Sequence, residues 1–150
     1  MKADSVEEFL GSLQESMGRA WKKHLKTDKY SDHKALNEFY DDIVDLVDTL
    51  IEDYQGLHGV VDSLKNVIDS EGMSAVEYLE ELRELTLDGR DKFIDDDEPE
   101  LKSDVDAILS LIDGTLYKLK ELKEDNESTN TSTNTSIPSL RDFLYEAIVN

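Results

Sequence analysis

Apolar residues recur at steps of three and four along most of the chain, a spacing that predicts amphipathic helices. The first helix is expected to begin near Ser5, because Ser5 and Glu8 have the spacing of a capping box. The apolar stripe of this helix then consists of Val6, Phe9, Leu10, Leu13, Met17, Ala20 and Trp21. His24 occupies the next position on this stripe, so we expect its side chain to face inward.

A second helix follows the polar segment KTDKYSD, in which Ser31 or Asp32 can act as the N-cap. This helix is predicted to end near Gly56. Its buried face should hold Phe39, Ile43, Leu46, Val47, Leu50, Ile51 and Tyr54. The pattern is weaker between residues 57 and 72, which indicates a crossover with at most a short helix.

Two further helices are predicted in the second half of the chain. One runs from about Ser74 to about Phe93, and the other follows the acidic turn IDDDEPE with the clearest stripe of all. That stripe consists of Val105, Ile108, Leu109, Ile112, Leu116, Leu119 and Leu122. Four helices with one long middle crossover indicate an all-α, ferritin-like four-helix bundle over residues 1–125. An up-down-up-down bundle is the alternative, because the sequence does not determine the path of the crossover.

The composition changes abruptly after the fourth helix. Residues 126–136, NESTNTSTNTS, have no apolar side chain to bury and predict a flexible polar linker. Residues 137–150 predict a C-terminal amphipathic helix that can dock onto its own assembly or onto another protein. The expected docking face consists of Leu140, Phe143, Leu144 and Ile148.

Charge and composition narrow the classes of partner. The chain has 36 acidic and 16 basic residues, a net charge of −20, which disfavours direct DNA binding and anionic membranes. It has no cysteine, so thiolate metal sites and disulfides are excluded. No apolar run approaches the roughly 18 residues of a membrane span, so we expect a soluble, cytoplasmic protein.

Two carboxylates and two histidines are the candidate metal ligands. Asp48 and Glu52 are four residues apart and share one face of the second helix. His33 precedes Asp48 by 15 residues, about 22 Å along a helix axis, so one ion cannot contact both in one chain. A joint site needs His33 from one subunit and the carboxylates from another, which predicts a two-fold dimer.

His24 and His33 flank one short turn and could converge on the same ion, for which iron, manganese or zinc is suitable. A different interpretation needs no metal. A buried His24 can simply be hydrogen-bonded, and the second helix carries many carboxylates in any case. These are Asp41, Asp42, Asp45, Asp48, Glu52 and Asp53.

From Trp21 to Gly56 the sequence resembles the first two helices of the Dps proteins, which are miniature ferritins. The spacing of His33, Asp48 and Glu52 matches the second histidine and the two carboxylates of that family, whereas His24 and His33 are nine residues apart instead of twelve. The segment HLKTDKYSDHKAL is also similar to Dps-like proteins of tailed phages.

The Dps resemblance implies a shell of twelve subunits with a ferroxidase centre at each two-fold interface and peroxide as oxidant. His24, His33, Asp48 and Glu52 would then bind iron, with no further catalytic residue. Trp21 would act as an electron donor, or else simply as a core anchor. The acidic run Asp95, Asp96 and Asp97 would mark an ion entry pore, or else a solvated loop.

The phage likeness implies a different class of function. In this alternative the protein is a non-enzymatic structural or accessory protein that docks to a capsid component through residues 137–150. It would then reside in the host cytoplasm or in the virion.

Overall fold

The computed structural model describes residues 2–122, which form four α-helices and no strand. The helices are α1 (Val6–Lys26), α2 (Tyr30–His58), α3 (Ala75–Phe93) and α4 (Pro99–Glu121). Short turns join α1 to α2 and α3 to α4, whereas residues 59–74 form a long connection without helix. The prediction of an all-α bundle with four helices is confirmed.

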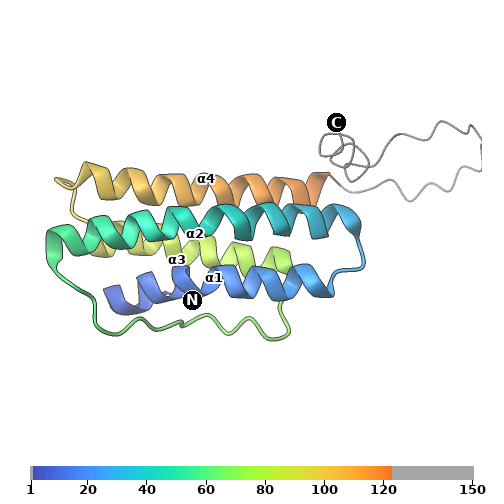
Figure 1. The fold of residues 1–150 in the computed structure, drawn as a ribbon, viewed down its shortest axis with the longest axis horizontal. Helices are drawn as coiled ribbons and strands as arrows, with labels where there is room; N and C mark the ends of the chain where they lie inside the picture. Colours follow the sequence, from blue (N-terminus) through green and yellow to red (C-terminus); the bar gives the residue numbers. More distant parts are fainter. Residues whose placement is uncertain (1, 123–150) are drawn as a thin grey trace, which may run out of the picture.

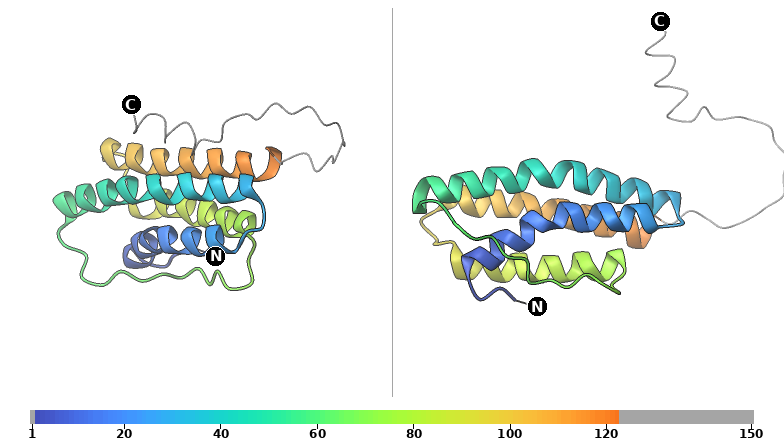
Figure 2. Two further views of the ribbon diagram at one scale, coloured as in Figure 1. Left: turned by 45° about the vertical axis from the view of Figure 1, so that its right-hand side comes forward. Right: turned by 60° about the horizontal axis from the view of Figure 1, so that its bottom comes forward.

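The four helices stand at the corners of an elongated bundle. Helix α1 packs against α2 and α3, and α4 packs against the same two helices. The connection of residues 59–74 runs along the length of the bundle, so α2 and α3 point in the same direction (Figures 1 and 2). This path differs from that of an up-down-up-down bundle, in which consecutive helices are antiparallel.

The core is built mainly from the apolar stripes that the sequence predicts. Its largest fully buried side chains are Tyr78, Phe9, Phe39, Leu10, Leu13, Leu36, Ile43, Leu50, Ile68, Leu79, Leu82 and Leu85. Met17, Trp21 and Leu122 depart from the prediction, because 39%, 51% and 51% of their surface is exposed. The expectation that Trp21 anchors the core is therefore wrong: its position lies on the outer edge of the α1 stripe.

The helix starts agree with the predicted cap at one of two sites. Ser5 Oγ accepts a hydrogen bond from the Glu8 backbone N–H at 3.2 Å, as a capping box requires. Ser74 caps α3 in the same way. The prediction for α2 was wrong, because this helix begins at Tyr30, before Ser31 and Asp32, and its N-cap residue makes no side-chain cap bond.

Helix α1 holds the long connection directly against its surface. The backbone N–H of Lys65 donates to the Glu7 carbonyl at 3.1 Å, and that of Val67 donates to Ser12 Oγ at 3.0 Å. Gly11 makes this approach feasible, because a Cβ atom at this position would lie 2.2 Å from the Lys65 backbone nitrogen. The connection is therefore a packed part of the bundle.

Some predictions lie outside the described residues. They are the end of the bundle at residue 125, the linker of residues 126–136 and the docking helix of residues 137–150, with Leu140, Phe143, Leu144 and Ile148. Among the helices that the structure does describe, none combines the length and the apolar character needed to cross a membrane.

Candidate metal centre

His24 and His33 lie face to face where α1 ends and α2 begins. Their ring centroids are 3.8 Å apart and the ring planes are inclined by 31°. His33 Nδ1 is 3.0 Å from the backbone carbonyl oxygen of His24, and a carbonyl can only accept. The Nδ1 atom of His33 therefore donates this hydrogen bond, and in the neutral imidazole with this tautomer the lone pair is on Nε2. A backbone carbonyl orients many metal-binding imidazoles in this way.

His24 is buried, with 6% of its surface exposed, and its Nδ1 atom has no hydrogen-bond partner. Within residues 2–122, no hydrogen bond joins the Nε2 atom of His33 to another residue, and the polar contact of the His24 ring is with the backbone of Trp21. Burial lowers the pKa of His24, and the nearby His33 lowers it further, against the opposing effects of the Trp21 backbone and Asp41. The imidazole of His24 is thus held neutral, the form that binds metal.

Polar and aromatic groups of α2 support this pair. Tyr40 packs edge-on against the His24 ring, with centroids 5.2 Å apart. The Tyr40 hydroxyl donates to Asn37 Oδ1 at 2.6 Å, and Asn37 Nδ2 donates to Asp41 Oδ2 at 3.2 Å. These contacts fix the rings, but they add no third ligand. Nowhere in residues 2–122 do three or more His, Asp and Glu side chains gather closely enough to hold a metal ion.

Asp48 and Glu52 are exposed on α2, far from the histidines of the same chain. Since α2 is one continuous helix, the 15-residue separation from His33 corresponds to about 22 Å, as the sequence predicts. Asp48 borders a groove of about 170 Å³ between α1 and α2. The other residues of this groove are Leu13, Gln14, Met17, Ile43, Val44, Val47 and Ile51. The structure thus brings together the two histidines and, separately, the two carboxylates.

The remaining predicted site residues occupy exposed positions. Trp21 is half exposed on α1, one helical turn before His24. Asp95, Asp96 and Asp97 are exposed in the turn between α3 and α4, where Asp96 lies 3.6 Å from the Lys102 ammonium. An electron-donor role for Trp21 and an ion-entry role for this turn stay predictions.

Two polar contacts between helices had no signal in the sequence. His58 Nε2 contacts the carboxylate of Glu98, and the His58 ring stacks on Tyr54 with centroids 4.5 Å apart. Asp104 of α4 lies beside Asp53 of α2, and burial together with this neighbour raises the pKa of Asp104 to about 6. Both contacts join residues about 40 to 50 positions apart, which helical periodicity alone cannot pair.

Comparison with known protein families assigns the chain to one of them. A family of unknown function, DUF5856, matches residues 24–119, from His24 to the last turns of α4. The chain belongs to this family. No curated protein and no solved structure matches the chain.

The assignment to the Dps family, and to the Dps-like proteins of phages, was therefore wrong. It depended on about 36 residues and on the spacing of His33, Asp48 and Glu52. The acidic surface of α2 can supply a carboxylate pair at many spacings, so this match carried little information. The family description names no ligand or partner, so iron binding, the oligomer and docking to a phage capsid stay predictions.

Proposed function

We propose that the protein binds a divalent first-row metal ion, such as iron, zinc or manganese, through His24 and His33. The observation that supports this best is a pair of adjacent imidazoles, in which the Nε2 atom of His33 makes no hydrogen bond within the described residues. One ring is oriented by a backbone carbonyl, and the other is buried and kept neutral. Imidazole is a common ligand for these metals.

Two histidines leave a metal ion short of ligands, and we propose that Asp48 and Glu52 of a second copy complete the coordination. At about 100° per residue, His33, Tyr40, Val44, Asp48 and Ile51 lie within about 80° on one side of α2. If two copies pack antiparallel through this side, the histidines of one copy face the carboxylates of the other.

The same side of the molecule exposes apolar surface, which supports a second copy there. Met17 and Trp21 of α1 and Val44 of α2 are 39%, 51% and 45% exposed, and Met17 and Val44 border the groove beside Asp48. We call this surface, defined by Met17, Trp21 and Val44, the α1–α2 face. In this proposal the bundle is of ferritin type, with residues 59–74 as its crossover.

Calorimetric titration of the metal-stripped protein with Zn²⁺ tests the site. The variants H24Q/H33Q and D48N/E52Q should each lose most of the heat of binding, because each removes half of the ligands. The variant D42N/D45N changes two other exposed carboxylates of α2 and should bind like wild type. If H24Q/H33Q binds as tightly as wild type, the proposal fails.

A mixing experiment tests whether two copies share the site. The H24Q/H33Q and D48N/E52Q proteins are unfolded together and refolded, so that about half of the dimers contain one chain of each. Each mixed dimer regains one intact site of two, so the mixture should bind about a quarter of the wild-type amount of Zn²⁺. If the mixture binds no more than the separate variants, the site is not shared between copies.

A further inference from the structure

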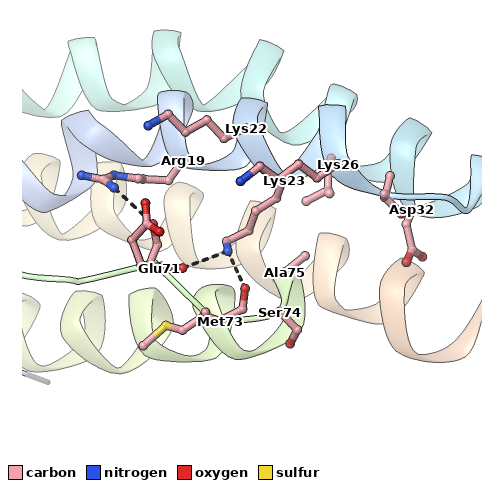
Figure 3. Close-up of a pocket in the computed structure, with 13 residues that line it drawn as sticks. Arg19, Lys22, Lys23, Lys26, Asp32, Glu71, Met73, Ser74 and Ala75 are labelled. Carbon is pink, nitrogen blue, oxygen red and sulfur yellow. Dashed lines mark hydrogen bonds between the residues drawn. The ribbon is translucent and has the colours of Figure 1, made fainter.

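A cavity of about 560 Å³ lies on the opposite side of α1 from the groove beside Asp48. It is enclosed by the second half of α1, the end of the long connection and the start of α3 (Figure 3). Four cations line it, namely Arg19, Lys22, Lys23 and Lys26. They are a quarter of the 16 basic residues of the chain, gathered within eight positions.

Two of these cations build the wall of the cavity. Lys23 Nζ donates to the backbone carbonyls of Ser70 and Met73 at 3.2 and 2.6 Å, and Arg19 donates to Ser70 Oγ at 3.3 Å (Figure 3). Burial lowers the pKa of Lys23, and the neighbouring Lys26 lowers it further. These bonds hold the connection against α1 and fix the shape of the cavity.

The other two cations are available to a ligand. Lys22 and Lys26 are exposed, and the ammonium group of neither makes a hydrogen bond or ion pair with another residue of the described chain. Only two carboxylates line the same cavity, those of Asp32 and Glu71, so its charge is positive in a protein of net charge −20. Both lysines line one concavity, whose volume is in the range of small-molecule sites.

The start of α3 adds to this positive potential. Ser74 caps the helix, and its Oγ and carbonyl oxygen accept from the backbone N–H groups of Glu77 and Tyr78. Within residues 2–122 no group accepts from the N–H groups of Ala75 and Val76, which lie at the positive end of the helix dipole, and Ala75 lines the cavity.

We propose that this cavity binds a phosphorylated small molecule of about nucleotide size. The phosphates would lie between Lys22, Lys26 and the start of α3. The two ammonium groups and the backbone N–H groups of α3 would donate charge-assisted hydrogen bonds to them, which are stronger than hydrogen bonds between neutral groups. Leu36 and Met73 line the same cavity and offer apolar contact to the body of the ligand. This proposal is independent of the metal site, because it involves neither histidine.

Titration calorimetry with ATP and with pyrophosphate, both in the presence of EDTA, tests the proposal on the full chain. EDTA removes free metal, so binding cannot occur through a metal at His24 and His33. We expect both probes to bind, and the variant K22Q/K26Q to weaken each by about tenfold or more. Lys23 and Arg19 are left intact, because they hold the connection in place.

The variant K29Q/K65Q is the matched control, since it removes two other exposed lysines and changes the net charge equally. It should bind both probes as wild type does. An equal loss in both variants would mean a general charge effect and would overturn the proposal. So would the absence of pyrophosphate binding, because the site is inferred from its affinity for phosphate.

Discussion

At the residue scale, five buried polar side-chain atoms of the described residues have no hydrogen-bond partner. Two of them are Nδ1 of His24 and Oδ2 of Asp104, whose pKa values shift in opposite directions from their ordinary values. Unpaired buried polar atoms are costly and therefore rare in folded proteins. The lowered pKa of His24 favours its neutral form. Asp104 lies beside a second carboxylate, that of Asp53, and its pKa is raised.

The Asp104 pair should make the bundle less stable above neutral pH. The pKa of Asp104 is about 6 in the folded chain, above its ordinary value of 3.8. The protonated Asp104 side chain therefore contributes stability that is fully present below about pH 4 and is lost as the pH rises through 6. Asp104→Asn should raise the unfolding free energy by about 1 kcal/mol at about pH 8, after allowance for solvent screening, and by less at about pH 5.

Urea unfolding of wild type and variant at the two pH values checks this prediction. The variant D45N removes an exposed carboxylate of α2 and corrects for the general effect of charge. If D104N and D45N show the same pH dependence, the Asp53–Asp104 contact does not control stability.

At the scale of elements, the long connection depends on one glycine of α1. The backbone of Lys65 passes so close to Gly11 that a methyl group there must displace it. Helix α1 also contains Gly18, beside which no atom lies within 4 Å of an added Cβ. The two glycines therefore form a matched pair on one helix.

Gly11→Ala should destabilise the protein by about 2 kcal/mol or more, since overpacking outweighs the gain in helix propensity. Gly18→Ala should stabilise it by about 0.5–1 kcal/mol, because only the propensity term changes. Thermal and urea unfolding of the two variants measures both effects. Equal stabilisation by both substitutions would show that the connection does not lie against Gly11.

The same element shows what the sequence can and cannot predict. Periodicity located all four helices, and the Ser5 cap was visible as a local pattern. The close approach at Gly11 could not be predicted, because it depends on where a segment 54 residues later returns. For the same reason the sequence identified His24 and His33 as a pair across one short turn, but missed the pairing of Asp53 with Asp104.

The charge of −20 dominates at the scale of the whole molecule, because it opposes any contact between two copies. The α1–α2 face offers apolar contact but little opposite charge, so association through it must overcome this repulsion. Salt screens the repulsion and slightly strengthens apolar contact. Self-association should therefore tighten as salt rises, whereas a dimer held by ion pairs would weaken.

Sedimentation equilibrium of the metal-free protein at about 0.02 M and about 0.5 M NaCl measures this, since the Debye length falls several-fold between them. Val44→Glu places a charge in the α1–α2 face and should abolish association at both concentrations. Leu87→Glu adds the same charge at an exposed apolar position of α3 and should associate as wild type does. Both substitutions change half-exposed side chains, so neither should unfold the bundle.

If wild type is monomeric at both concentrations, or if the two variants behave alike, the α1–α2 face is not where two copies meet. The carboxylates at Asp48 and Glu52 would then have no route to the histidines of another chain.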